Sequence, residues 1–269
     1  MKRLLRALAV LFFLVPWIWT ALTALKAEQN LQLYPEQIFP GGWPWQWNWS
    51  NLLACLEVVP MHLYTWNTAQ LAMLSTVAHI VSCPLAAYAL LNLPNRWQKL
   101  VWMLTLAAYV VPYPVVMLGQ YLVFQKLGWV NSWLPILVPC CLGNPFFILY
   151  LYQAFKRFPK ELIESSRLEG ATNWQILFQV ILPNSQAALV TVAILTVQSV
   201  WNDFLSPLLY LQDQSLYTVN LGLQFYRSAY QVSWSLMMSA SLISVAPMVV
   251  LFLLAQPYFI RDSLEGSEK

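Results

Sequence analysis

Residues 66–91 read WNTAQLAMLSTVAHIVSCPLAAYALL and contain no Asp, Glu, Lys or Arg. A helix needs about 20 mostly apolar residues to cross a bilayer, so this stretch is long enough to span one. Its apolar residues run without alternation, which favours a helix over a strand. The stretches that meet the same criterion are about Leu4–Leu25, Trp66–Leu91, Leu100–Phe124, Ser132–Phe155, Ala187–Leu211 and Val232–Ile260. The sequence therefore predicts an all-α, polytopic membrane protein with six transmembrane helices.

The composition also indicates a membrane protein. Apolar residues make up 59% of the 269 residues and charged residues 9%, whereas soluble domains are about 25% charged. So few charges cannot cover the surface of a soluble particle. The net charge of +3 is small and dispersed, which argues against nucleic-acid binding. The four Cys and two His show no ligand-like spacing, so neither a metal site nor a disulfide scaffold is predicted.

The basic residues indicate the orientation. The N-terminal apolar run is longer than the roughly 7–15 residues of a signal peptide core and has no small-residue cleavage site after it, so we interpret it as a retained helix. With both termini in the cytoplasm, eleven of the fourteen Lys and Arg residues lie inside. Those outside are Lys26, Lys126 and Arg227. This distribution follows the positive-inside rule and predicts cytoplasmic termini.

Two long loops organise the chain. The outer loop, about residues 26–65, contains PGGWPWQWNW at residues 40–49. Tryptophan at this density favours a bilayer interface, and a docking surface for an external partner is the alternative. The second loop, residues 156–183, lies on the cytoplasmic side. The predicted organisation is a first helix and outer loop at 1–65, a core domain at 66–260 and a cytoplasmic tail at 261–269.

The cytoplasmic loop is predicted to form two short helices separated by a glycine. Pro159 suits the first turn of a helix, and Gly170 can end that helix by adopting φ > 0. Thr172 or Asn173 can cap the second helix, and Pro183 is expected to end it before the next span. Helical spacing gives the second helix an apolar face, open to the bilayer or a partner, formed by Ile176, Leu177, Val180 and Ile181.

The same loop resembles the EAA motif of ATP-binding cassette (ABC) importer permeases. That pattern is Glu-Ala-Ala, three residues, Gly, nine residues, an apolar residue and Pro. Here Gly170 follows Glu164 at the required spacing, and Leu182-Pro183 follows Gly170. Other strings, in the family's order, resemble the smaller permease subunit of maltose-type carbohydrate importers: Trp66–Thr68, Cys83–Ala89, Phe158–Leu162, Trp201–Leu208 and Gln256–Ile260.

The resemblance implies the type I ABC importer permease fold, in which this loop is the coupling helix that sits in a groove of an ATPase subunit. Glu164 would pair with a basic group of the ATPase, and Gly170 would be the elbow. The tail at 261–269 lacks the usual Gly-rich segment. Ser165 and Ser166 stand where the motif has Ala, and Glu169 where it has Asp. The predicted ATPase-coupling residues are Glu164, Ser165, Ser166, Glu169, Gly170, Ala171 and Pro183.

The resemblance also implies a function and its partners. The chain would be one permease subunit of an ATP-driven, binding-protein-dependent importer in a bacterial inner membrane. Its partners would be a second, longer permease in a heterodimer, two ATPase subunits, an extracytoplasmic solute-binding protein and lipid. No Gly-x-x-x-x-Gly-Lys-Ser/Thr motif occurs, so the chain is expected neither to be an enzyme nor to bind a cofactor, and ATP and Mg²⁺ would belong to the ATPase subunits.

The alternative is a stand-alone secondary carrier or a polytopic membrane enzyme. Such a protein would account for the spans but would leave the motif of the cytoplasmic loop unexplained. The solute implied by the resemblance is a sugar or sugar-like compound, such as an oligosaccharide, a glycosyl-glycerol or a similar osmolyte. The few basic residues within the spans favour a neutral solute.

Polar residues inside the spans are candidates for a translocation path. A carboxylate near the centre of a spanning helix costs about 2.5–3.5 kcal/mol unless it has a partner or water. No catalytic constellation is present, and a lone His79 in an apolar span is most simply a packing residue. The residues predicted to line the path are Asn202, Asp203, Gln198, Asn144 and Gln120. The prolines expected to bend the third and fourth spans or free carbonyls for a pore are Pro112, Pro114, Pro139 and Pro145.

Overall fold

The structure, a computed structural model, describes residues 2–227 and 233–265. The regular elements of these residues are helices, apart from an isolated bridge at Arg227, and this confirms the predicted all-α class. Contacts divide the chain into two compact units. The first unit is Met1–Asn67 with Tyr217–Val250, and the second is Thr68–Leu216 with Leu251–Lys269. The predicted domain boundaries at 65 and 260 are not tested by this division and stay a prediction.

The first unit combines the N-terminal part of the chain with a segment near its C-terminus. Its elements are α1 (Lys2–Ala24), α2 (Glu28–Leu33), η1 (Pro44–Gln46), α3 (Asn51–Val58), the start of α4 (Met61–Leu91), α14 (Val219–Gly222), η4 (Leu223–Tyr226) and the first part of α15 (Trp234–Glu265). The helix α15 includes the beginning of the predicted tail, and residues 266–269 of that tail lie outside the described residues.

Hydrogen bonds connect the end of α1 to the outer loop. The Asn51 side chain donates to the carbonyls of Ala24 at 2.8 Å and Lys26 at 2.9 Å, which satisfies acceptors that a helix end leaves free. The backbone N–H of Asn48 donates to the Leu25 carbonyl at 3.0 Å. The tryptophan-rich loop is therefore attached directly to the end of the first apolar helix.

Two tryptophans of that loop form an exposed stacked pair. The rings of Trp43 and Trp45 lie 5.2 Å apart and nearly parallel, and their side chains are 65% and 72% exposed. The Trp49 indole donates to the Pro44 carbonyl at 2.8 Å. Their exposure at the end of an apolar helix agrees with the predicted interfacial belt, which stays a prediction.

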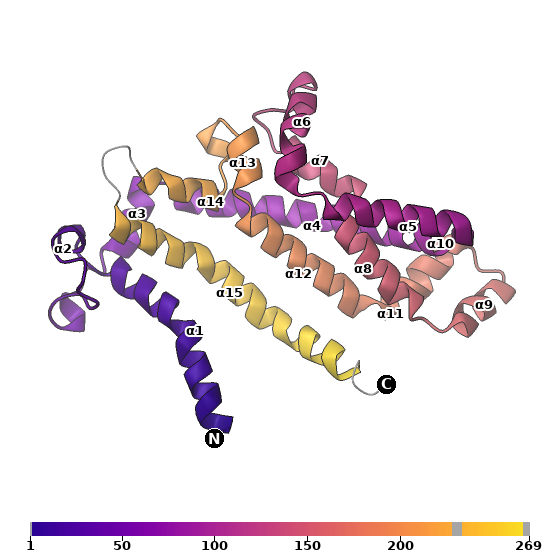
Figure 1. Cartoon of the computed structure of the whole chain (residues 1–269), viewed down its shortest axis with the longest axis horizontal. Coiled ribbons are helices and arrows are strands. Elements are labelled where there is room, and N and C mark those ends of the chain that lie inside the picture. Colours follow the sequence, from indigo (N-terminus) through magenta and orange to yellow (C-terminus); the bar gives the residue numbers. More distant parts are fainter. Residues whose placement is uncertain (1, 228–232, 266–269) are drawn as a thin grey trace. The chain divides into compact units, whose positions relative to one another are not determined.

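The second unit holds most of the described helices. Its elements are the remainder of α4, α5 (Asn95–Val110), α6 (Tyr113–Lys126), α7 (Leu134–Leu142), α8 (Pro145–Lys156), α9 (Lys160–Leu168), α10 (Asn173–Gln175), the π-helix η2 (Ile176–Ile181), α11 (Leu182–Asn184), α12 (Gln186–Asn202), α13 (Leu205–Tyr210), η3 (Gln214–Leu216) and the end of α15. Within this unit α8 and α12 lie side by side, with α4 behind them (Figure 1).

The core of the second unit joins α4, α8, η2 and α12. Small side chains such as Cys83, Ala87 and Ala188 allow close approach of these helices, which is the usual source of packing energy where lipid is as apolar as the protein. The best-buried large members of this core, each at most 1% exposed, are Leu151, Phe155, Ile176, Leu177, Ile181 and Val192. The second half of the cytoplasmic loop is thus built into the helix bundle.

The spans are less regular than the sequence predicts. Three helical stretches are long and apolar enough to cross a membrane, namely Met61–Leu91, Leu134–Lys156 and Trp234–Leu254. Two bent pairs raise the number to five, and Leu8–Ala24 of α1 is a shorter apolar helix. Among the described residues these six stretches correspond to the six predicted spans, and two of them are bent.

Two of the predicted spans are interrupted by breaks in the helix. Pro112 holds Val111 in an extended conformation, φ −68° and ψ 119°, so α5 and α6 meet at a 94° bend. The prediction that prolines bend the third span is confirmed, but the bend separates it into two helices. The predicted Ala187–Leu211 span is wrong at its end, since α12 stops at Asn202 and Asp203 is extended, φ −70° and ψ 125°.

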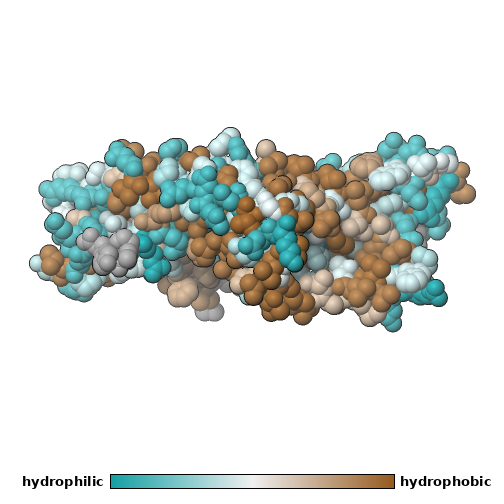
Figure 2. Space-filling model, turned by 90° about the horizontal axis from the view of Figure 1, so that it is seen from above, coloured by the Kyte–Doolittle hydropathy of each residue, from teal (hydrophilic) through white to brown (hydrophobic). Residues whose placement is uncertain are grey.

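The surface of the second unit separates by polarity. Figure 2 shows hydrophilic residues gathered at the end of this unit that carries α9, and apolar residues over the neighbouring helices. Helix α9 contains Lys, Glu, Arg and Ser residues, whereas α5 and α7 expose residues such as Leu104, Val110 and Leu142. This is the distribution expected of helices in lipid with a polar segment at the membrane surface.

Candidate coupling loop and translocation cavity

The first helix of the cytoplasmic loop ends at glycine as predicted. Helix α9 begins at Lys160, directly after Pro159, and Gly170 adopts φ +84°. The Gly170 N–H donates to the Arg167 carbonyl at 3.0 Å, and the Ala171 N–H donates to the Ser166 carbonyl at 3.0 Å. These two bonds form a Schellman motif, which satisfies the last carbonyls of the helix and turns the chain.

The second helix of the loop begins at Thr172 and continues past the proline. The Thr172 hydroxyl accepts from the Gln175 N–H at 3.3 Å, and the Gln175 side chain accepts from the Thr172 N–H at 2.8 Å, which is a capping box. The helix ends at Asn184, one residue after Pro183 and before α12 begins, which agrees with the expectation that Pro183 ends it before the next span. The chain then bends by 78° at Ser185.

The apolar face of this second helix is used inside the chain. Ile176, Leu177 and Ile181 are at most 1% exposed and belong to the core with α4 and α8. The prediction that this face is open to the bilayer or a partner is therefore wrong for these residues. The sequence pattern located an apolar face correctly, but only the packing of α4 and α8 decides what covers it.

A different surface of the loop is exposed. Leu168 is 90% exposed and Trp174 is 63% exposed, with the Trp174 ring stacked on Phe178 at 5.9 Å. Glu164 is exposed on α9, and within the described residues it forms no ion pair. The loop therefore leaves a carboxylate and several apolar groups uncovered at the polar end of the unit.

A hydrogen bond joins α9 to the residue that follows α4. Glu164 and Arg167 help to line a hollow of about 340 Å³ beside Asn92 and Tyr152. The Arg167 guanidinium donates to the Asn92 side chain at 3.0 Å. Ser165 and Ser166 stand where the motif has alanine. Their hydroxyls donate to the Leu162 carbonyl at 3.1 and 2.8 Å, so both hydroxyl groups have hydrogen-bond partners within α9.

A second site is an open cavity of about 400 Å³ within the second unit. Three of the five residues predicted for a translocation path line it, namely Gln120 from α6, Asn144 at the start of α8 and Asp203 after α12. Gln198 and Asn202 do not line it. They lie on an exposed part of α12, where the Asn202 side chain donates to the Gln198 carbonyl at 2.8 Å.

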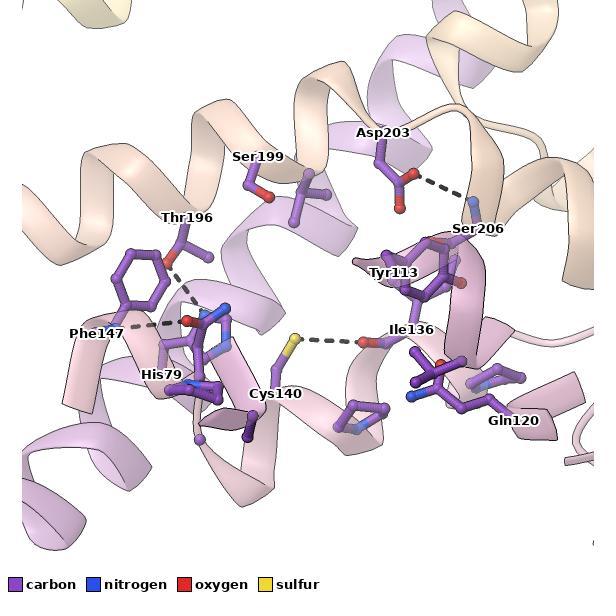
Figure 3. Close-up of a pocket in the computed structure, with 18 of the residues that line it drawn as sticks. His79, Tyr113, Gln120, Ile136, Cys140, Phe147, Thr196, Ser199, Asp203 and Ser206 are labelled. Carbon is purple, nitrogen blue, oxygen red and sulfur yellow. Dashed lines mark hydrogen bonds between the residues drawn. The ribbon is translucent and has the colours of Figure 1, made fainter. Parts of the chain in front are cut away.

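The cavity wall also contains residues that sequence reasoning did not assign to it. His79 is 7% exposed, contacts Phe147 edge-on at 5.1 Å and lies 3.1 Å from the Thr196 hydroxyl (Figure 3). Ser199 and Tyr113 line the same cavity. His79 packs against Phe147, as the predicted packing role implies, and it also lines the cavity, which was not predicted. Its position as a lone polar ring in an apolar span is the signal that could have indicated this.

The arrangement matches a known family of transport proteins. The family model for the binding-protein-dependent transport system inner membrane component matches residues 80–263. That segment contains the whole cytoplasmic loop and most of the cavity wall. The chain belongs to this family. It is thus a permease component of the inner membrane, and the resemblance noted in its sequence is confirmed.

Individual relatives agree with this assignment. The permease is 29% identical to the probable ABC transporter permease protein YurM of Bacillus subtilis, over 94% of its own length and 83% of the relative. It is 28% identical to the sulfoquinovosyl glycerol transport system permease protein SmoH of Agrobacterium fabrum, over 95% and 89%. A bacterial ABC transporter that imports the acidic polysaccharide alginate has the same fold, with a TM-score of 0.79, 18% identity and coverage of 96% and 95%.

Proposed function

We propose that this permease is one membrane subunit of an ATP-driven ABC importer for a sugar or sugar-like solute. The observation that carries the proposal is the exposed surface of Glu164, Leu168 and Trp174 on a loop that is otherwise packed into the bundle. An unpaired carboxylate among uncovered apolar side chains is what a docking partner with a basic group would cover. The names of the relatives support the solute class.

The proposed complex contains the parts that the sequence resemblance implies. A solute-binding protein outside the membrane delivers the solute, this chain and a second, longer permease enclose the path, and two ATPase subunits bind ATP and Mg²⁺. Closure of the ATPase subunits turns the path outward, and ATP hydrolysis returns it inward. This chain hydrolyses no ATP itself, and its termini lie in the cytoplasm.

In this mechanism α9 transmits motion from the ATPase to the bundle. Glu164 forms an ion pair with a basic group of the ATPase, and the elbow at Gly170 sets the angle between α9 and the second helix of the loop. Because Ile176 and Ile181 lie in the core beside α4 and α8, displacement of the loop acts directly on these helices. The cavity lined by Gln120, Asn144 and Asp203 is the candidate path.

Co-purification of the tagged chain from its native membrane in mild detergent tests this proposal. We expect an ATPase and a second permease to co-elute with the wild-type chain. Glu164→Lys should reduce the recovered ATPase at least about tenfold, because leaving one side of a partly buried ion pair unmatched costs several kcal/mol.

The matched control is Glu57→Lys, which makes the same charge change at an exposed residue of α3, outside the cytoplasmic loop. We expect this variant to retain the ATPase. Elution of the wild-type chain alone, under conditions that keep a control ABC complex intact, would contradict the importer function. Equal ATPase recovery with both variants would contradict the role of Glu164.

A further inference from the structure

The polar groups of the cavity in the second unit point to a particular solute chemistry. We propose that this cavity admits uncharged, polyhydroxylated solutes and repels anions, with His79 and Asp203 as its specificity-determining hydrogen-bond acceptors. The inference rests on the proposed transport function, since it assigns a chemistry to the path that this function requires.

The hydrogen bonds of His79 decide which ring nitrogen is available. The Thr196 hydroxyl donates its single hydrogen to the Val192 carbonyl at 2.8 Å, so it accepts from Nδ1 of His79 at 3.1 Å. Within the described chain no carboxylate forms an ion pair with this buried ring, and an unpaired charge there would be costly. The ring is therefore neutral, with its hydrogen on Nδ1 and an acceptor at Nε2.

Asp203 supplies a second acceptor on the wall (Figure 3). One oxygen of its carboxylate accepts from the Ser206 N–H at 3.2 Å, near the start of α13. The other oxygen makes no hydrogen bond among the described residues and is available to a solute hydroxyl. His79 comes from α4 and Asp203 from the segment between α12 and α13, so the acceptors lie at separate points of the wall.

Neutral donors complete the wall. The Asn144 side-chain oxygen accepts from the Phe146 N–H at 2.9 Å, which leaves its NH₂ group free to donate. Gln120 and Ser199 also line the cavity and can both donate and accept. A sugar hydroxyl is at once a donor and an acceptor, so a mixed set of this kind suits a polyhydroxylated solute.

The charge on the cavity wall is negative. Among the described residues that line it, none is Lys or Arg, and Asp203 is the acidic one. In a site of reduced dielectric a carboxylate repels an anion and attracts a cation over several ångströms. A permease of the same fold serves an importer of the acidic polysaccharide alginate, so the fold itself leaves the solute's charge open and the wall must decide it.

The test uses thiol reagents of opposite charge on the purified complex. Ser199 is exposed in the cavity, so Ser199→Cys places a thiol there. The probes are the cationic trimethylammonium-ethyl and the anionic sulfonatoethyl methanethiosulfonate. Their rates are measured with and without ATP and vanadate, and each is divided by its rate with 2-mercaptoethanol. Mass spectrometry of the peptide that contains residue 199 separates this thiol from the four native cysteines.

We expect the normalised rate of the cation to exceed that of the anion by about tenfold, since one nearby charge in a medium of intermediate dielectric produces an effect of that order. Asp203→Asn should bring the ratio close to one while preserving the fold, because the amide oxygen can still accept from Ser206. Gln120→Glu adds a second carboxylate and should raise the ratio.

The control is Asp213→Asn, which removes an exposed carboxylate outside the cavity and should leave the ratio unchanged. The proposal is overturned if the two reagents label Ser199→Cys at equal normalised rates, or if adding Asp203→Asn leaves their ratio unchanged. It is also overturned if residue 199 is not labelled either with or without ATP and vanadate. If the ATPase still co-purifies, these results overturn the charge selection alone. Absence of the ATPase from the wild-type complex would instead overturn the transport function.

Discussion

At the scale of single residues, two residues with unusual surroundings hold the loops of this permease in place. Gly170 ends α9 with a left-handed backbone, and no atom lies within 4 Å of the position a Cβ would take. Tyr226 is 3% exposed and donates its hydroxyl to the Cys55 carbonyl at 2.5 Å. The first depends on backbone conformation alone, and the second on a buried hydrogen bond.

Gly170→Ala should destabilise the folded chain by about 1–2 kcal/mol, because a residue with a Cβ is strained at this φ. Open space around the site excludes a steric contribution. Thermal unfolding of the purified chain in detergent measures the effect. Gly119→Ala is the control, since Gly119 also has open space but lies in helix α6, where Ala is favoured by up to about 1 kcal/mol. Equal unfolding midpoints of the two variants would contradict the left-handed elbow.

Tyr226 predicts a loss of stability in alkali. Burial is the main cause that raises the pKa of this phenol above its ordinary value of 10.0. The folded state thus holds its proton more tightly than the unfolded state, so the stabilisation is complete below pH 10 and declines as pH rises above it. Tyr226→Phe should remove this decline, as followed by unfolding at pH 8 to 11. The exposed Tyr34, changed to Phe, is the control, and an identical pH profile in all three proteins would contradict the prediction.

At the scale of elements, the N-terminus of one helix is capped by a residue that is distant in the sequence. The Glu28 carboxylate, in α2, accepts from the N–H groups of Trp234 at 3.2 Å and Ser235 at 2.9 Å, and from the Ser235 hydroxyl at 2.7 Å. A carboxylate at a helix N-terminus satisfies free donors and interacts favourably with the helix dipole. The start of α15 is therefore capped by a residue from the other end of the sequence.

Glu28→Ala should lower the free energy of unfolding by about 2–3 kcal/mol, since it leaves several donors without a charged acceptor. Glu28→Gln should cost about half as much, because the amide oxygen still accepts but carries no charge. Chemical unfolding of the purified chain measures both. Glu36→Ala, at an exposed residue of the outer loop, should have little effect, and an equal loss in this control would show that the cap contributes nothing.

At the scale of the whole molecule, the described helices leave most of their apolar surface uncovered. In the most apolar 18-residue segment of Met61–Leu91, 39% is buried within the chain. In the corresponding segments of Leu134–Lys156 and Trp234–Leu254, 17% is buried. Such helices need lipid or other subunits against them. The chain is therefore expected to depend on its surroundings for stability more than a soluble domain does.

Co-expression with the second permease should raise the thermal midpoint of this chain by several degrees over the chain expressed alone, because a partner that binds only the folded state stabilises it. Scanning fluorimetry in one detergent compares the two preparations. Co-expression with an unrelated polytopic protein is the control. An unchanged midpoint with the true partner would indicate that lipid, and not a second permease, covers these helices.

The sequence by itself determined the properties that depend on length, composition and local spacing. Apolar runs show the membrane class because the bilayer sets a minimum helix length. The glycine elbow, the cap at Thr172 and the bend near Pro112 follow from backbone preferences of single residues. The coupling motif was recognisable because its residues keep a fixed spacing along one loop.

Only the tertiary structure decided how distant segments meet. It brought Gln120, Asn144 and Asp203 to one cavity but left Gln198 and Asn202 outside, because the side of α12 that faces the other helices depends on the turn at Ser185. It buried the apolar face of η2 against α4 and α8, and it placed His79 on the cavity wall. These outcomes depend on side-chain packing between elements far apart in the chain, and no pattern within one segment contains that information.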